Sequence, residues 1–170
     1  MKVRLARPED AAGIAAVHVR TWQAAYEHVF GAERLAGLDP ERRRLGWERA
    51  LSERSEHEED VFVAEQDEQV VAFASTGPAG DEPGVAELYA IYALPEAWGS
   101  GAGPALMREA LAALRGRGFA EAILWVLEDN PRARRFYERE GWRLDDGESA
   151  RKVEPHLGVD VVQVRYRISL

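Results

Sequence analysis

The sequence contains no cysteine among its 170 residues. This absence excludes disulfide bonds, thiolate metal ligands and a cysteine nucleophile, and it is compatible with a reducing compartment. The sequence also lacks an apolar run long enough for a signal peptide or a membrane span, because charges interrupt the apolar residues of its start, MKVRLARPED. We therefore expect a cytoplasmic protein that has no membrane partner.

Basic residues are in the minority, with 22 Lys and Arg against 30 Asp and Glu and a formal net charge of −8. Nucleic-acid backbones are bound by clustered Lys and Arg, so this balance argues against nucleic acid and favours a cationic small molecule or peptide. The histidines show no paired metal-ligand spacing, and we expect no metal site; they are His18, His28, His57 and His156. We interpret the acidic segment around His57 as a solvated connection.

The apolar pattern predicts one domain over residues 1–170, with 46% hydrophobic residues along its length. Its order is strand, helices, three strands, helix, strand, helix, strand, which indicates an α+β (mixed α/β) sheet with helices on its faces. Strands are expected around Val3 and Leu5, at Val61–Glu65, Gln69–Thr76, Val85–Leu94 and Ala122–Leu127, and in VVQVRYRI near the C-terminus. Helices are expected up to about Tyr26, after Asp39-Pro40, from Pro104 to Gly116 and from Pro131 to Glu140.

Three glycines on alternate positions, Gly99, Gly101 and Gly103, precede a predicted helix in PEAWGSGAGPALMREAL. Bare backbone can approach a ligand closely, and a helix N-terminus offers unpaired N–H groups, so the segment favours a phosphate site. The dinucleotide pattern G-x-G-x-x-G fails at Pro104, and no Gly-Lys-Ser/Thr follows as in nucleoside-triphosphate loops. From these residues alone, a phosphate site and a plain flexible turn remain alternatives.

A second motif, NPRARRFYEREGW at 130–142, resembles the signature N-x-x-A-x-x-F-Y-x-x-x-G-F of the GNAT superfamily of N-acetyltransferases, with Trp142 in place of Phe. The segment WGSGAG is similar to that family's Q/R-x-x-G-x-G/A pyrophosphate loop, although Trp98 replaces the usual Gln or Arg and Pro104 lacks an N–H. The resemblance implies a mostly antiparallel, twisted sheet of about six to seven strands flanked by helices. It also implies that two parallel strands, Val85–Ala93 and Ala122–Leu127, splay apart.

Acetyl-coenzyme A is the cofactor that the resemblance implies. Its pantetheine arm would pair with backbone groups of Ile91, Tyr92 and Ala93. Its pyrophosphate would lie on the N–H groups of Gly99, Ser100, Gly101, Ala102 and Gly103. Asn130 matches the family's cofactor-contacting asparagine. The helix arginines that follow could meet the cofactor's phosphates or face solvent, and both interpretations remain open; they are Arg132, Arg134 and Arg135.

The implied reaction is transfer of an acetyl group to a primary amine of a small molecule or peptide. Without cysteine there can be no cysteinyl acyl-enzyme, so direct transfer in a ternary complex is expected. Tyr137 matches the family's general acid, with packing against Phe136 as the alternative interpretation. Glu87 is a candidate general base, although a carboxylate at a strand end is often only solvated. Trp22 and Tyr26 are candidates for the acceptor pocket.

Two other functions stay open. Acetylation of protein N-termini or lysines would need an open groove beside residues 22–30 and 159–164. A non-catalytic acyl-CoA sensor would bind the cofactor without turnover. Members of the family are often dimers, and the final strand could pair across a homodimer interface. The acceptor itself is not identified, since variable helices and loops build that pocket.

Overall fold

The computed structural model describes residues 1–53 and 59–170, so the acidic segment around His57 lies partly outside the described residues. The described strands form one sheet in the order β1-β2-β3-β4-β5-β8-β6, with β7 also paired to β8. Their bounds are β1 Lys2–Leu5, β2 Asp60–Gln66, β3 Gln69–Pro78, β4 Ala86–Ala93, β5 Glu121–Leu127, β6 Arg143–Leu144, β7 Arg151–His156 and β8 Val159–Ser169. All neighbours are antiparallel except β4 and β5.

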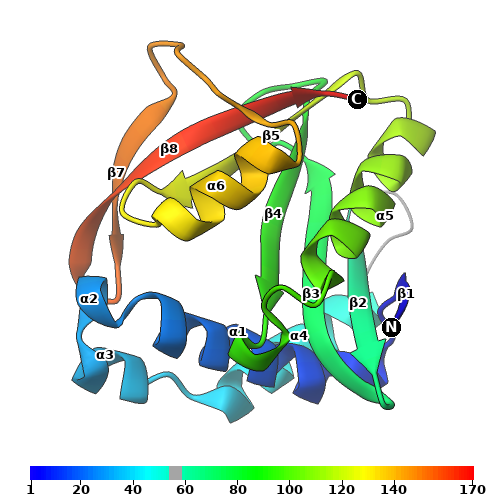
Figure 1. Ribbon diagram of the computed structural model, residues 1–170, viewed down its shortest axis with the longest axis vertical. Helices are drawn as coiled ribbons and strands as arrows, with labels where there is room; N and C mark the ends of the chain where they lie inside the picture. The colour runs from blue at the N-terminus through cyan, green and yellow to red at the C-terminus, as the bar shows by residue number, and fades with distance from the viewer. Residues whose placement is uncertain (54–58) are drawn as a thin grey trace.

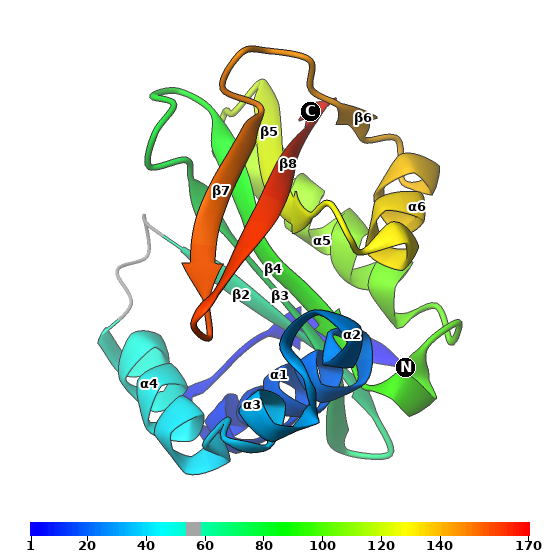
Figure 2. The same ribbon diagram turned by 90° about the vertical axis from the view of Figure 1, so that its left-hand side faces the viewer.

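Helices cover both faces of the sheet (Figures 1 and 2). One face carries α1 and α4, and the other carries α5 and α6. The helical segments are η1 Pro8–Asp10, α1 Ala11–Ala25, α2 Glu27–Phe30, α3 Ala32–Ala36, α4 Pro40–Glu53, η2 Pro95–Ala97, α5 Ala102–Gly116 and α6 Pro131–Arg139. Within the described ranges, no helix has the length and apolar character needed to cross a membrane.

Strand β2 shows why two helical layers are needed. Successive side chains of a strand point to opposite faces. Val61 and Val63 pack in the cluster that includes α1 and α4, whereas Phe62 and Ala64 pack against α5. An apolar run without alternation therefore encodes a strand that is covered on both sides.

The parallel pair β4–β5 is short. Only Ala86 opposite Ala122 and Glu87 opposite Ile123 are paired, after which the two strands separate (Figure 1). On the other side of β4, Thr76 lies opposite Leu88 and Ser75 opposite Ala90. Tyr89 is therefore an extra residue in β4, and such a bulge bends the strand that carries it. Residues 88–93 of β4 and 124–127 of β5 do not pair with each other, although each segment pairs with its other neighbour, β3 or β8. We call these two segments the β4–β5 fork; they confirm the expected splayed pair.

The C-terminal part of the sheet differs from expectation. A single strand is predicted after α6, but β6 and β7 precede β8 and make the sheet eight-stranded rather than six- or seven-stranded. The sequence of β7, RKVEPH, has no apolar alternation, because β7 is an edge strand whose Val153 is 59% exposed. Within the chain, β8 pairs with β5 along one edge and with β6 and β7 along the other, and a homodimer built on the final strand stays a prediction.

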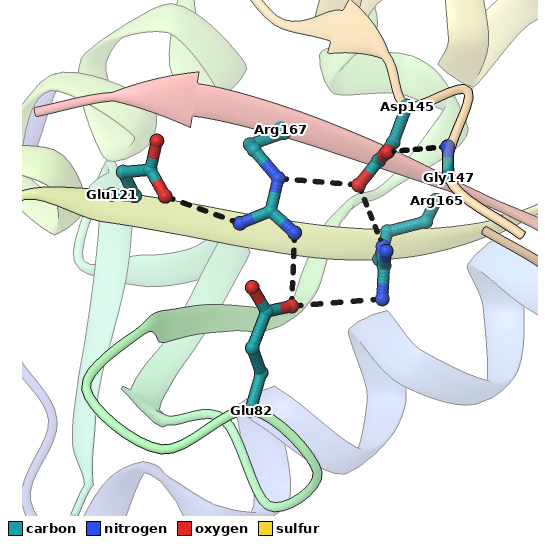
Figure 3. Close-up of polar contacts among 6 residues, drawn as sticks. All are labelled: Glu82, Glu121, Asp145, Gly147, Arg165 and Arg167. Atoms are coloured by element: carbon teal, nitrogen blue, oxygen red, sulfur yellow. Dashed lines mark hydrogen bonds and ion pairs between the residues drawn. The ribbon is translucent and has the colours of Figure 1, made fainter. Parts of the chain in front are cut away.

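Arg165 and Arg167 of β8 form ion pairs that connect the β3–β4 loop to the sheet (Figure 3). Arg165 and Arg167 each donate through Nε to Asp145 Oδ2, at 2.8 and 3.1 Å. Arg167 also reaches Glu82 of the β3–β4 loop at 2.9 Å and Glu121 of β5 at 3.3 Å. Burial alone would raise the pKa of Asp145, but hydrogen bonds from a backbone amide and both guanidinium groups outweigh burial and lower it.

Candidate active site

The sequence-predicted site residues gather around the β4–β5 fork. They come from the first helix, from both strands of the fork and from the two segments that follow those strands. This convergence follows from the topology, because the carboxyl ends of parallel strands meet at the same edge of a sheet. The segments after β4 and β5 therefore lie close together although they are separated in sequence, and both begin helices, α5 and α6.

The glycine segment adopts a conformation that requires glycine. Gly99 and Gly101 have φ values of +78° and +91°, and a Cβ at either position would meet no atom within 4 Å. The amides of Gly99, Gly101 and Gly103 make no hydrogen bond to any other described residue. By contrast, the Ser100 amide bonds back to η2 at 3.2 Å and the Ala102 amide approaches Ser100 Oγ at 3.4 Å. We call the three free N–H groups the amide cradle; they favour an anion site over a plain turn.

Gly103 also joins the two sequence motifs physically. A Cβ at Gly103 would lie 3.2 Å from Cε2 and Cζ of Phe136 in α6. The missing side chain therefore lets α6 pack against the first turn of α5. Pro104 lies in that same turn, where its missing N–H removes no intrahelical bond.

The end of β4 offers fewer backbone groups than expected. The Leu94 N–H donates to Val71 of β3 at 2.9 Å, and by strand alternation the backbone of Tyr92 also faces β3. The backbones of Ile91 and Ala93 face the fork. The Ala93 carbonyl already accepts from Thr21 Oγ1 at 2.9 Å and from Trp98 Nε1 at 2.8 Å. Ile91 is therefore the residue of the three whose N–H and C=O both remain available for pairing.

Tyr137 projects from α6 into the interior and is 8% exposed. Its hydroxyl makes no hydrogen bond to the rest of the described chain, so its proton is not committed to a protein acceptor. Burial raises its pKa above the usual range, and nearby Tyr26 and Tyr92 add to this effect. The Tyr137 hydroxyl is therefore a neutral donor at physiological pH.

Asn130 connects α6 to α1. Its Oδ1 accepts from the Ala133 N–H at 3.0 Å and caps α6, and its Nδ2 donates to the Tyr26 hydroxyl at 3.0 Å. Tyr26 is buried, and burial raises its pKa. Asn130 and Tyr26 thus have structural partners in addition to the cofactor and acceptor roles predicted for them.

Glu87 occupies the last paired position before the fork, opposite Ile123. Its side chain is half-buried, and burial raises its pKa; Asp81 adds to the rise and Lys152 opposes it. A carboxylate with a raised pKa is a better base near neutral pH than a solvated one. Its place at the head of the fork is compatible with the predicted role.

Trp22 is buried in an aromatic cluster, 8% exposed, with its ring stacked on Phe30 at 5.7 Å between centroids. His18 lies one turn earlier, between Trp22 and Tyr92, and burial lowers its pKa to about 4, so it is neutral at physiological pH. The tip of the β7–β8 hairpin reaches the same cluster, where His156 lies 6.3 Å from Trp22 between ring centroids (Figure 2). Trp22 therefore offers little exposed surface to an acceptor.

A hollow of about 370 Å³ lies between α2, the end of β5 and the start of β8. Its lining is apolar and acidic: Val29, Leu127, Glu128, Asp129, Asp160, Val161 and Val162. It adjoins both segments, 22–30 and 159–164, beside which acetylation of a protein N-terminus or lysine would require an open groove. Among the described residues no group of His, Asp and Glu side chains could hold a metal ion.

Sequence reasoning did not identify Thr21 or the donor role of Trp98 at the Ala93 carbonyl. Thr21 lies on the buried side of α1, and nothing in its local pattern distinguishes it from a packing residue. Trp98 is identifiable as a departure from the family's pattern, but its hydrogen bond depends on how the loop turns back over the end of β4.

Comparison with known proteins gives a consistent result. Residues 12–142 match the family model described as acetyltransferase (GNAT) family. The uncharacterized N-acetyltransferase YuaI of Bacillus subtilis is 38% identical over 133 residues, covering 76% of this chain and 73% of that protein. The probable N-acetyltransferase Rv2775 of Mycobacterium tuberculosis is 26% identical over 99% of this chain and 93% of its own. The crystal structure of PaiA N-acetyltransferase from Thermoplasma acidophilum in complex with coenzyme A superposes with a TM-score of 0.73 at 19% identity, covering 100% of both chains.

Proposed function

This chain belongs to the GNAT acetyltransferase family, and on that premise we propose that it moves the acetyl group of acetyl-CoA directly to a primary amine of a small molecule or peptide. The observation that carries the proposal is the β4–β5 fork, with the amide cradle at its edge and the Tyr137 hydroxyl beside it. A cofactor with a linear arm and a pyrophosphate suits an open strand edge next to free amides. Acetyl-CoA, the cofactor of this family, would supply the thioester.

The residues around the fork suit the binding of such a cofactor. Ile91 presents both an N–H and a C=O toward the fork, as strand-like pairing with an amide-containing arm requires. The amide cradle at the N-terminus of α5 offers the pyrophosphate three donors and a positive dipole end. The amides of Ser100 and Ala102 already form hydrogen bonds within the loop. These two residues would therefore hold the loop in shape rather than donate to the pyrophosphate.

The nitrogen loses two protons during the reaction, and the sulfur gains one. The amine nitrogen forms a bond to the acetyl carbon, and the carbon–sulfur bond breaks. An alkylammonium has a pKa of about 10, so it must lose a proton to attack, and Glu87 would accept that proton directly or through water. Tyr137 would donate its proton to the departing thiolate, whose conjugate acid has a pKa of about 8.5. The nitrogen loses a second proton as the amide forms, and that proton would restore the Tyr137 hydroxyl directly or through water. Because burial keeps Tyr137 protonated, the donor is in the required state.

A second candidate function, acetylation of a protein N-terminus or lysine, is favoured by the hollow beside α2. Its carboxylates would attract a cationic segment, and its apolar walls would cover the aliphatic part of a side chain. The hollow adjoins Leu127 at the end of the fork. A peptide that entered there would therefore bring its amine close to the Tyr137 side of the site.

The proposal is tested by free-thiol release from acetyl-CoA with a panel of amines, amino acids, antibiotics and lysine-containing peptides. We expect amine-dependent release with at least one class, and preference for peptides would favour the second candidate. Calorimetric binding of coenzyme A without release for any acceptor would instead indicate a binding-only protein. Binding of ATP or NAD in preference to coenzyme A would contradict the proposal. Light scattering decides whether the protein is a homodimer.

A further inference from the structure

Arg132 lies on the face of Trp98, at the junction of the two sequence motifs. The guanidinium carbon Cζ is 3.2 Å from the centroid of the Trp98 ring. The ring is itself held, because its Nε1 donates to the Ala93 carbonyl at 2.8 Å. Trp98 therefore joins the end of β4, the glycine segment and the first turn of α6, and it holds the charge of Arg132 at that junction.

The charge of Arg132 has no protein counter-ion. In residues 1–53 and 59–170, no carboxylate pairs with it and no acceptor receives a hydrogen bond from it. Its helix neighbour Arg134 is different, since it donates to the Tyr166 hydroxyl at 3.1 Å and to the Glu128 carbonyl at 3.2 Å. Partial burial lowers the pKa of Arg132, which means that its surroundings disfavour the cation.

A partly desolvated guanidinium near the N-termini of two helices is in an unfavourable place unless an anion joins it. Both α5 and α6 direct the positive ends of their dipoles toward this region. Aromatic stacking holds the guanidinium in a fixed orientation and leaves its N–H groups free, and a planar fork of donors matches a phosphate well. The amide cradle, which starts at the residue after Trp98, provides further donors.

We propose that Arg132 binds a phosphate group of coenzyme A and that Trp98 is the positioning residue that holds it there. This inference rests on the proposed function, since it assigns a residue to the cofactor of that reaction. It also accounts for Trp98 at the position of the usual Gln or Arg: the aromatic ring makes no phosphate contact but presents a cation from α6 instead. Of the three helix arginines, Arg132 is then the phosphate ligand, and Arg134 supports the β5–α6 junction.

The test is calorimetric titration of the intact protein with coenzyme A and with dephospho-coenzyme A, which lacks the 3′-phosphate but keeps the pyrophosphate. Arg132→Ala should raise the Kd for coenzyme A about 10-fold or more, as expected for a lost charge-assisted bond. An equal loss with both ligands would assign Arg132 to the pyrophosphate. A loss confined to coenzyme A would assign it to the 3′-phosphate. Unchanged affinity for both ligands would overturn the proposal.

The control is Arg139→Ala, which removes the same charge from the last residue of the same helix, about 10 Å away along its axis. It should leave both Kd values within about twofold. Trp98→Ala should weaken binding as Arg132→Ala does, and Trp98→Phe should restore much of the affinity because it keeps a ring face.

The double variant Trp98→Ala/Arg132→Ala should bind no more weakly than the worse single variant, because both remove one contact. Full additivity of the two losses would contradict the positioning role of Trp98. If the wild-type protein binds neither ligand, the proposed function fails first. If the wild-type protein binds both ligands but Arg132→Ala leaves both Kd values unchanged, only the assignment of Arg132 as a phosphate ligand fails.

Discussion

Replacing Tyr137 by Phe should separate activity from stability. The substitution removes one oxygen from a side chain that is 8% exposed and whose hydroxyl bonds to no other described residue. No partner is left unsatisfied and no cavity larger than a hydroxyl is formed, so we expect the free energy of unfolding to change by no more than about 0.5 kcal/mol. Loss of a general acid, by contrast, costs about 10²- to 10⁴-fold in rate, equivalent to about 3 to 5 kcal/mol of transition-state stabilisation.

The assay is single-turnover thiol release at saturating acetyl-CoA and amine, with urea unfolding and calorimetric binding of coenzyme A measured on the same samples. Tyr166→Phe is the matched control, since the Tyr166 hydroxyl donates to Glu138 at 2.8 Å and accepts from Arg134 at 3.1 Å. Removing that hydroxyl should cost about 1 kcal/mol of stability and leave the rate unchanged. A Tyr137→Phe protein that folds, binds coenzyme A and turns over within about twofold of wild type would refute the assignment.

Three further perturbations address the base, the sheet and the loop. Burial raises the pKa of Glu87, so kcat/KM should increase with pH, with a midpoint above the pKa of an ordinary glutamate. Glu87→Gln should abolish this pH dependence. Because the substitution also removes a charge that burial disfavours, the variant should unfold at an equal or higher urea concentration than wild type at pH 7. Asp145→Ala removes the main partner of Arg165, whose side chain is 8% exposed, and should cost about 2 kcal/mol at pH 7 by urea unfolding. Because the folded pKa of Asp145 is lowered, that difference should vanish as the pH falls through it, and persistence in acid would contradict the reasoning. Gly101→Ala forces a side chain onto a φ of +91° and should weaken coenzyme A binding, whereas Gly84→Ala, at +83° in the β3–β4 loop, should cost similar stability without affecting binding.

The family and the main architecture could be predicted because local chemistry encodes them. The glycines of the loop and Asn130 at the start of α6 are residue types that favour the backbone conformations found there. The two motifs together indicated the family that the comparisons confirm. The central strands are predictable from apolar runs, since β2 is buried on both faces. Strand β7 was missed because it is an edge strand, where exposure removes the apolar signal.

Side-chain partners across the fork were beyond prediction for a different reason. The stacking of Arg132 on Trp98 depends on where the loop after β4 lies relative to α6, and no pattern within either segment specifies that distance. The same holds for Thr21, which reaches the Ala93 carbonyl from a helix far earlier in the chain. Sequence identifies which residues can donate or carry charge, but tertiary packing decides which of them meet.

Two structural features with opposite effects shape the β4–β5 fork: a bulge in β4 and a close contact between α5 and α6. The extra residue Tyr89 bends β4 just after its pairing with β5 ends, and the strand edge that a cofactor arm would use lies open from there on. Strands that diverge would carry the helices after them apart, yet Gly103 lets Phe136 approach and keeps α5 and α6 in contact. At this site the strands β4 and β5 are separated, whereas the helices α5 and α6 are in contact. The N-termini of the two helices therefore lie close together, and the edges of β4 and β5 that face each other remain unpaired. Neither motif alone therefore distinguishes a phosphate site from a turn. The bulge in β4 contributes to the free strand edge, and the contact between Gly103 and Phe136 brings the N-termini of α5 and α6 together.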